Sequence, residues 1–239
     1  MAGADVVTEA LSGVSDWRAE GDRPTQYGMD LLADGPLVAH LVSAGLGVMS
    51  EESGRHHPDR PLCAVIDPVD GSTNASRRIP WYATSIAVVD ADGVRAAVVR
   101  NQATSVTYSA TRGGGAFRDG VDIHVSSVTA LAAAVVAVNG HPPRHLGWSQ
   151  YRALGAAALD ICLVAEGAID GYMDCTFSSH GPWDYLGAML VLTEAGGWIA
   201  DADGRGLITI EHGDRRTPVA AGTAVLGEEL LAGRRSFDV

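Results

Sequence analysis

The sequence has few cysteines, and their arrangement argues against an extracellular disulfide scaffold. Only three of the 239 residues are cysteine: Cys63, Cys162 and Cys175. They lie far apart, form no CxxC pair and are odd in number, which is typical of reduced thiols in a cytosolic protein. We therefore predict that all three are packing residues and that the protein is cytoplasmic.

Positive charge is also scarce. Lys and Arg together number 17 against 29 Asp and Glu, so the formal net charge is −12. Because nucleic acid and anionic lipid are themselves negative, neither a nucleic-acid polymer nor a membrane is a predicted partner. A small anionic substrate would need a local positive charge, and a bound cation can supply one.

The chain has no long apolar run and none of the features of a secretory leader. No stretch reaches the roughly 18 apolar residues expected of a membrane-spanning helix. The first residues, MAGADVVTEALSG, contain neither a basic region nor an apolar core. An internal repeat and a low-complexity linker are missing too. The hydrophobic fraction of 46% is ordinary for a globular protein with a buried core.

Hydrophobic periodicity predicts an α+β pattern in the first half of the chain. Apolar residues recur at helical intervals over residues 4–43, with a break at residues 21–24, so two helices joined by a turn are expected. Antiparallel strands are then predicted at residues 62–67, 83–90, 94–101 and 106–110.

The pattern changes to α/β from about residue 128. Strands are predicted at residues 134–139, 169–174, 198–201 and 219–221, with helices at 151–166 and 183–194 and a closing helix. We therefore predict an N-terminal α+β lobe over residues 1–127 and a C-terminal α/β lobe over residues 128–239. An active site is expected in the cleft between them.

The segment IDPVDGSTN, residues 66–74, concentrates oxygen-bearing groups at the end of a predicted strand. Pro68 stiffens the exit from the strand, and Gly71 permits a tight turn. Asp67 and Asp70 are close enough to repel each other, which raises their pKa unless a cation lies between them. Mg²⁺ favours oxygen ligands, and the Val69 carbonyl can join the pair. The alternative interpretation is a plain surface turn.

Two distant segments favour the metal-site interpretation. PWDYLGAMLVLTEAGG, residues 182–197, places Asp184 in the first turn of a predicted helix, where the N-terminus favours a carboxylate. VMSEESG, residues 48–54, places Glu51 and Glu52 upstream of the DPVDG strand. Taken alone, the first acid could be a simple helix cap and the Glu pair a solvated loop.

Together these segments resemble the signatures of the inositol monophosphatase family, DPxDGTxN, WDxAAGxxLxxEAGG and G-E-E-S. Ser72 stands where the family often has threonine, and Ser50 replaces the usual glycine. The family consists of Mg²⁺-dependent, lithium-sensitive phosphatases, and its superfamily includes fructose-1,6-bisphosphatase and bisphosphate nucleotidase. The resemblance implies a layered α/β/α/β/α sandwich of the sugar phosphatase type.

The resemblance also implies a mechanism, in which water attacks a phosphate monoester directly with the help of two or three Mg²⁺ ions; Mn²⁺ is an alternative. The implied metal ligands are Glu51, Asp67, the Val69 carbonyl, Asp70 and Asp184. The implied catalytic residues are Glu51, Ser72 and Asp70. The backbone amides of Gly71 and Ser72 are implied to hold phosphate oxygens.

Departures from the family pattern concern the substrate. The implied substrate-binding residues are Asp70, Ala156 and Asp174. The last stands where the family has a glutamate, and the following segment, CTFSSHGP, is longer than usual. We predict that His180 in that segment lies on the surface. Arg77 and Arg78 are predicted to be an exposed pair and not a site for a second phosphate, and the role of Asp34, in DLLADGP, is left open.

The predicted function is hydrolysis of a small polyol or sugar phosphate, with inositol monophosphate as the default substrate. Histidinol phosphate, a 3'(2'),5'-bisphosphate nucleotide and a sugar phosphate of secondary metabolism are alternatives; CLVAEG, residues 162–167, resembles the bisphosphate nucleotidase branch. A different class of function is a catalytically inactive member that acts as a binding subunit. The presence of every implied side-chain ligand argues against it. Because family members are commonly homodimers, a homodimer is also predicted.

Overall fold

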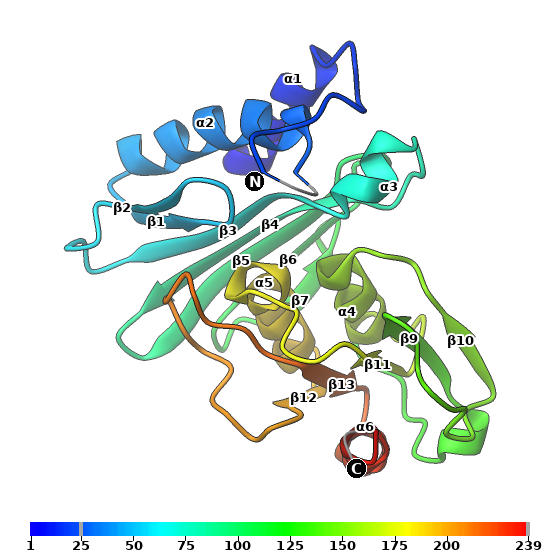
Figure 1. Ribbon diagram of the computed structural model, residues 1–239. Helices are drawn as coiled ribbons and strands as arrows, with labels where there is room; N and C mark the ends of the chain where they lie inside the picture. Colours follow the sequence, from blue (N-terminus) through cyan, green and yellow to red (C-terminus); the bar gives the residue numbers. More distant parts are fainter. Residues whose placement is uncertain (24–25, 238–239) are drawn as a thin grey trace.

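Five layers of helix and sheet alternate in the computed structural model, which describes residues 1–23 and 26–237 (Figure 1). Helices α1 (Ala2–Ser12) and α2 (Gly28–Ser43) lie on the outer side of the first sheet. Helices α4 (Ala157–Ala165) and α5 (Pro182–Glu194) lie between the two sheets. Helix α6 (Ala224–Arg235) lies on the far side of the second sheet. This order confirms the predicted sandwich.

The first sheet has eight strands in the order β2-β1-β3-β4-β5-β6-β7-β8. Its strands are β1 (Gly47–Ser50), β2 (Gly54–His56), β3 (Cys63–Asp70), β4 (Ala83–Asp90), β5 (Gly93–Asn101), β6 (Thr107–Thr111), β7 (Ala116–Arg118) and β8 (Val121–Asp122). Neighbours from β3 to β8 are antiparallel, which confirms the predicted arrangement. Strand β1 was not predicted, and it runs parallel to β3.

The second sheet has five strands in the order β10-β9-β11-β13-β12. Its strands are β9 (Val135–Asn139), β10 (Gln150–Arg152), β11 (Gly171–Asp174), β12 (Trp198–Asp201) and β13 (Pro218–Ala221), and the short 3₁₀ helix η1 (Leu131–Ala133) precedes β9. Strands β9, β10 and β11 are parallel, whereas β13 is antiparallel to both of its neighbours. Whether residues 1–127 and 128–239 are separate folding units stays a prediction.

The helix predicted at residues 151–166 is wrong over residues 151–156. Residues 150–152 extend as β10 beside β9, and α4 begins only at Ala157. Gly155 lies between them with a φ of +87°, a left-handed conformation that ends any helix running through it. A Cβ on Gly155 would lie 3.2 Å from the Asn74 side chain. A contact with so distant a residue leaves no trace in local periodicity.

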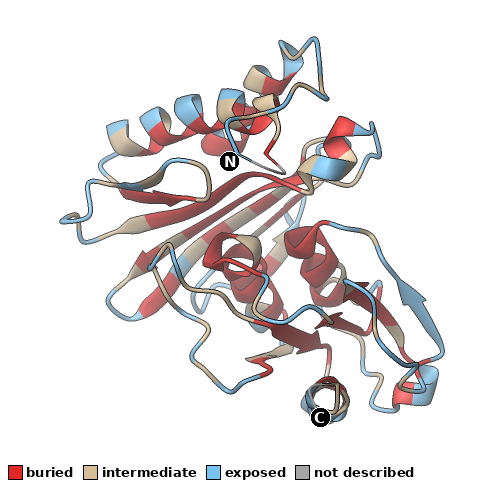
Figure 2. Ribbon diagram, viewed as in Figure 1, coloured by how far each residue is buried: buried red, intermediate tan, exposed pale blue. Residues whose placement is uncertain are grey.

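The burial of each helix follows from its layer. Helix α2 buries Met29, Ala33 and Leu37 at intervals of four residues, so one face packs on the first sheet and the other faces solvent. Helix α5 is buried almost all round because both of its sides face a sheet (Figure 2). Pro182 suits the start of α5, where its missing N–H costs nothing.

Two further predictions can be compared with the described residues. Cys63, Cys162 and Cys175 are all free, as predicted. No helix within the described ranges combines the length and the apolar character needed to cross a membrane.

Gly71 connects β3 to the short helix α3 (Ser72–Ser76) in a conformation that only glycine adopts easily. Its φ is +84°, and an added Cβ would lie 3.0 Å from both the Ala156 Cβ and the Trp81 carbonyl oxygen. The layer formed by α4 and α5 therefore packs directly against this turn. Gly113 has a similar φ of +72° but open space around it.

We expect Gly71→Ala to destabilise the protein more than Gly113→Ala does. Left-handed strain alone costs roughly 1–2 kcal/mol, which is the expected loss for Gly113→Ala. At Gly71 the steric overlap adds to it, for a total of about 2–4 kcal/mol. Urea unfolding of both variants measures the difference, and equal losses would show that the turn relaxes without cost.

Candidate metal centre and active site

Strand β3 brings both acids of the DPVDG segment to the same place through an irregularity in its pairing. Its register with β4 shifts between Asp67 and Asp70. Pro68 has no N–H, and its carbonyl accepts a hydrogen bond from the Thr84 hydroxyl (2.9 Å). The Val69 N–H donates to Asp67 Oδ1 (2.9 Å). The strand thus continues past its predicted end, and the bulge sets the positions of both carboxylates.

Three carboxylates from distant segments converge at this point. Oxygen atoms of Glu51, Asp67 and Asp184 all lie within 4.8 Å of one another. Glu51 follows β1, and its N–H donates to the Ile66 carbonyl of β3 (3.1 Å). Asp184 lies in the first turn of α5, where its Oδ2 accepts from the Gly181 N–H (2.8 Å). The predicted ligands Glu51, Asp67 and Asp184 are therefore brought together.

The electrostatics of this cluster favour a bound cation. Burial raises the pKa of Glu51, Asp67 and Asp70 well above the usual range, and the charges of neighbouring carboxylates raise it further. Every donor in the group is a carboxylate oxygen, the ligand type that hard divalent ions such as Mg²⁺ prefer. The residues present therefore fit a divalent metal ion.

Asp70 lies beside this trio and is held separately. Its Oδ2 accepts a hydrogen bond from the Ala158 N–H at the start of α4 (2.7 Å), and its side chain is buried. Ala156, the residue before α4, is also buried and lies next to Gly71. The structure thus places Asp70, Gly71 and Ala156 close together, as their predicted roles require. Those roles stay predictions.

A polar cavity of about 180 Å³ opens beside the carboxylates. Glu51, Val69 and Ser72 line it together with residues from the C-terminal half of the chain, so both halves contribute to one site. A larger cavity of about 410 Å³ lies at α1 and the first sheet, but it is apolar and contains none of the predicted site residues. A site for a phosphate ester needs convergent polar groups, which the smaller of these two cavities offers.

The prediction that His180 lies on the surface is wrong. Its backbone forms an antiparallel bridge with Arg216, and its side chain is buried. The Nδ1 atom lies 3.1 Å from Asp184 Oδ2, and Nε2 lies 2.8 Å from the Tyr172 hydroxyl. Burial alone would lower the pKa of His180, but the hydrogen bond to Asp184 and nearby carboxylate charges outweigh it and raise the pKa to about 9.

Asp174, the predicted counterpart of a substrate-binding glutamate, has no exposed surface. Its Oδ1 accepts from Asn139 Nδ2 and from the Thr176 N–H, and its Oδ2 accepts from the Ser179 hydroxyl, each at 2.9 Å. A direct contact between Asp174 and a substrate would require these hydrogen bonds to rearrange. Its role in substrate binding stays a prediction.

Asp30 is a candidate site residue that the sequence analysis missed. It is 3% exposed, lines the cavity and leaves Oδ1 without a hydrogen-bond partner among the described residues. Its Oδ2 accepts from the Tyr27 N–H at the start of α2 (2.9 Å). Burial raises the pKa of Asp30 to about 7. The three-residue spacing of Tyr27 and Asp30, typical of a helix start, was the signal available in the sequence.

The other polar residues considered in the sequence analysis make contacts outside the carboxylate trio. Asp34 lies one turn further along α2 and accepts a hydrogen bond from the Ser50 hydroxyl. Glu52 forms an ion pair with Arg23, and the neighbouring Glu51 is the residue that belongs to the carboxylate trio. Arg77 and Arg78 are both exposed, as predicted, and the guanidinium of Arg78 lies 4.2 Å from the Trp17 ring centroid.

Comparison with known proteins identifies the class to which this fold and acidic site belong. The sequence profile of the inositol monophosphatase family matches residues 37–236. The inositol-1-monophosphatase of Rhizobium meliloti (strain 1021) is 31% identical over 244 aligned positions, which cover 93% of this chain and 82% of that protein. The Nus factor SuhB of Escherichia coli (strain K12) is 32% identical over 173 positions, which cover 66% of this chain and 63% of that protein.

A solved structure shows the same fold. A hypothetical protein from Pyrococcus horikoshii, described as having similarities to inositol-1 monophosphatase, superposes with a TM-score of 0.84 at 23% identity and covers 96% of this chain and 95% of its own. The layered fold and its acidic centre thus define a sugar-phosphatase-type sandwich protein. The chain belongs to the inositol monophosphatase family, which confirms the resemblance and supports its assignment as a phosphatase, a class of hydrolase.

We expect Asp30→Asn to stabilise the metal-free protein at pH 8 and to have little effect at pH 4. The folded-state pKa of Asp30, about 7, exceeds its ordinary value of 3.8, so deprotonation costs stability as the pH rises through that window. The amide removes this cost, on the order of 1 kcal/mol or more, and its oxygen can still accept from the Tyr27 N–H. Urea unfolding with a chelator present measures it. The same stability change at both pH values would contradict this assignment.

Proposed function

We propose that the protein is a Mg²⁺-dependent phosphomonoesterase acting on a small polyol or sugar phosphate, with inositol monophosphate as the first substrate to test. The observation that carries this proposal is the convergence of Glu51, Asp67 and Asp184 beside a cavity that Ser72 also lines. Family membership and the relative from Rhizobium meliloti support the same activity.

Groups of this chain would hold the ions. The proposed ligands are Glu51, Asp67, the Val69 carbonyl, Asp70 and Asp184. All of them are oxygen donors, as Mg²⁺ and Mn²⁺ prefer. When bound, such ions would neutralise the phosphate dianion and lower the pKa of a water molecule.

Ser72 and Glu51 are proposed to orient the attacking water and to take its proton. Both residues line the cavity. A serine hydroxyl both donates and accepts hydrogen bonds, so it can fix the water while the nearby carboxylate accepts the proton. The N–H groups of Gly71 and Ser72, at the start of α3, have no acceptor earlier in the helix. We propose that they donate to the phosphate oxygens.

The alcohol part of the substrate is proposed to lie near Asp70, Ala156 and Asp174. One oxygen of Asp70 is held by the Ala158 N–H, which leaves the other for an ion or a substrate hydroxyl. Ala156 offers only a methyl group. Recognition of the alcohol would therefore depend on Asp70 and on residues 175–181, which separate β11 from α5.

We expect the wild-type protein to release phosphate in the presence of Mg²⁺ and to lose this activity with a chelator. The assay would use inositol, sugar and histidinol phosphates and a nucleotide bisphosphate. Asp70→Asn and Asp184→Asn should each lower turnover on the order of 100-fold or more, because each removes a proposed ligand charge. Mn²⁺ is expected to substitute in part.

Asp122→Asn is the matched control, because this exposed acid on β8 lies outside the cavity, and it should retain wild-type turnover. Mg²⁺ binding measured by calorimetry separates loss of metal from loss of chemistry. If the wild type releases no phosphate from any compound while Mg²⁺ still binds, the catalytic proposal fails.

That result would favour the alternative that the chain is a binding subunit. A relative named as a Nus factor shows that names in this family are not confined to phosphatases. The complete set of carboxylates, retained despite their mutual repulsion, favours the enzyme. The predicted homodimer is a separate proposal that sedimentation velocity can test.

A further inference from the structure

One cation in the site cavity has no acidic partner. Arg23 pairs with Glu52, whereas Arg215 makes no ion pair within residues 1–23 and 26–237. The Nη1 group of Arg215 donates to the carbonyl oxygens of His212 and Asp214, both at 2.8 Å. Its Nε and Nη2 donors find no acceptor in the described part of the chain. Arg215 therefore brings a positive charge and unused donors to the cavity.

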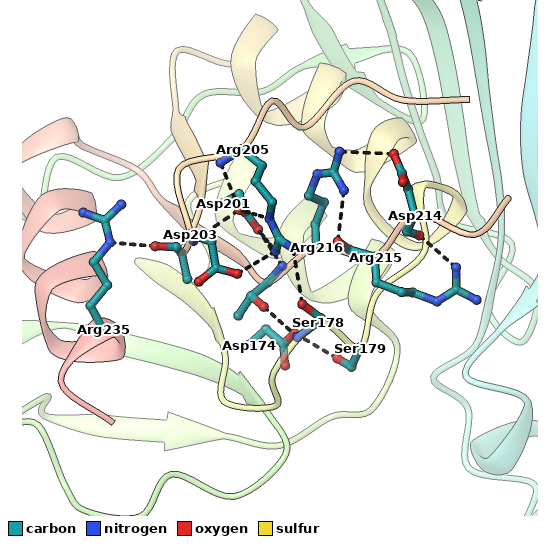
Figure 3. Close-up of polar contacts among 12 residues, drawn as sticks. Asp174, Ser178, Ser179, Asp201, Asp203, Arg205, Asp214, Arg215, Arg216 and Arg235 are labelled. Carbon is teal, nitrogen blue, oxygen red and sulfur yellow. Dashed lines mark hydrogen bonds and ion pairs between the residues drawn. The ribbon is translucent and has the colours of Figure 1, made fainter. Parts of the chain in front are cut away.

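Two nearby arginines, Arg205 and Arg216, differ from Arg215 because each pairs with a carboxylate (Figure 3). Arg216 donates from Nε to the Gly206 carbonyl, from Nη1 to the Arg215 carbonyl and from Nη2 to the Asp214 carboxylate. Arg205 forms a two-point contact with Asp201. In Figure 3 the side chains of Arg215 and Arg216 point in different directions, and only Arg216 reaches a carboxylate. Arg216 is structural, whereas Arg215 keeps free donors.

The Trp183 ring holds Arg215 in place, and a second aromatic ring packs on Trp183. Its guanidinium lies 4.9 Å from the centroid of the Trp183 ring, a cation–π contact. The His212 ring packs on the same indole at 4.9 Å, and His212 Nε2 lies 3.1 Å from the Glu51 carbonyl oxygen. Trp183 immediately precedes Asp184 in α5. The wall formed by Trp183, His212 and Arg215 is therefore attached at two points to the metal centre.

The loop that carries His212 and Arg215 is held at its ends by hydrogen bonds. The buried Asp201 carboxylate accepts from Arg205 and from the Thr217 N–H (2.8 Å), which closes residues 202–216 into a loop. The Ser178 N–H donates to the Thr217 hydroxyl (2.9 Å) and ties this loop to the one that carries His180. Arg215 thus needs little reordering to meet a ligand, which reduces the entropic cost of binding.

We propose that Arg215 binds the phosphoryl group of the substrate and the inorganic phosphate product, in addition to the amides of Gly71 and Ser72. This inference rests on the proposed phosphatase activity and assigns one more residue to its phosphate site. A guanidinium presents parallel N–H donors that match two phosphate oxygens. The cavity volume of about 180 Å³ is about six times the ~30 Å³ share of one liquid water, so a phosphate ion fits.

Calorimetric titration of inorganic phosphate into the Mg²⁺-loaded protein tests the proposal without measuring turnover. We expect Arg215→Gln to weaken phosphate binding about tenfold or more, because a charge-assisted two-point contact is lost. Arg215→Lys should recover part of the affinity, since it keeps the charge but not the planar fork. Phosphate affinity within twofold of wild type in Arg215→Gln would overturn the proposal, and so would a wild type that binds no phosphate.

Arg55→Gln is the control for the loss of one positive charge. Arg55 pairs with Glu211, in the same loop as Arg215, but it does not line the cavity. We expect its phosphate affinity to stay within twofold of wild type. A further measurement on the wild type avoids any folding defect of a variant: phosphate should slow the modification of Arg215 by p-hydroxyphenylglyoxal, followed by mass spectrometry, and should leave Arg55 unprotected. No protection of Arg215 would count against the site.

The outcomes distinguish this proposal from the proposed function. If phosphate binding depends on Arg215 but no ester is hydrolysed, the phosphate site stands and the catalytic proposal fails. If esters are hydrolysed and Arg215→Gln changes neither phosphate affinity nor KM, the activity stands and the role of Arg215 is rejected.

Discussion

Mutual repulsion among closely spaced carboxylates is the constraint on which the rest of the structure depends. Glu51, Asp67 and Asp184 approach within 4.8 Å, and among the described residues only the Asp184 carboxylate of the three contacts a basic side chain, that of His180. In a poorly solvated environment such a cluster destabilises the fold unless a cation or protons compensate. The chain keeps the carboxylates in place with backbone donors: Val69 N–H for Asp67 and Gly181 N–H for Asp184. These contacts hold the acids in position before any ion arrives.

The fold supplies these positions through three pieces of tertiary structure. Parallel pairing of β1 with β3 places Glu51 beside the end of β3, and the bulge in β3 turns both Asp67 and Asp70 into the site. Helix α5, buried between the two sheets, fixes Asp184 at its first turn. The helix cannot shift without disturbing packing on both sides. A layered fold therefore suits a site that must hold like charges close together.

The sequence predicted the acidic centre from local motifs and the family resemblance, and it missed features that depend on contacts between distant segments. Asp67 and Asp70 could be recognised because Pro68 and Gly71 define the turn chemistry within a few residues. Asp30 could not be separated from Asp34 in this way, since both lie on the buried side of α2 one turn apart and only the tertiary fold shows which of them lines the cavity.

Burial of His180 was missed for a related reason. It depends on a backbone bridge to Arg216, far along the chain, and such pairing leaves no periodic signal. The late start of α4 likewise depends on Gly155 packing against Asn74. Contacts between segments far apart in sequence account for each of these errors, whereas the class of each half followed from periodicity and the order of layers from the family resemblance.

The two halves of the chain contribute differently to the site, and this suggests where substrate preference arises. Asp67 and Asp70 lie in β3 of the first sheet and Glu51 directly follows β1, and strand pairing leaves these positions little freedom for change. The residues that surround them from the other half, including His180 and His212, lie on connections that follow strands β11 and β12 of the second sheet. Loops tolerate change better than paired strands do. Selection for a new phosphate ester would therefore act on these loops and leave the acidic centre intact.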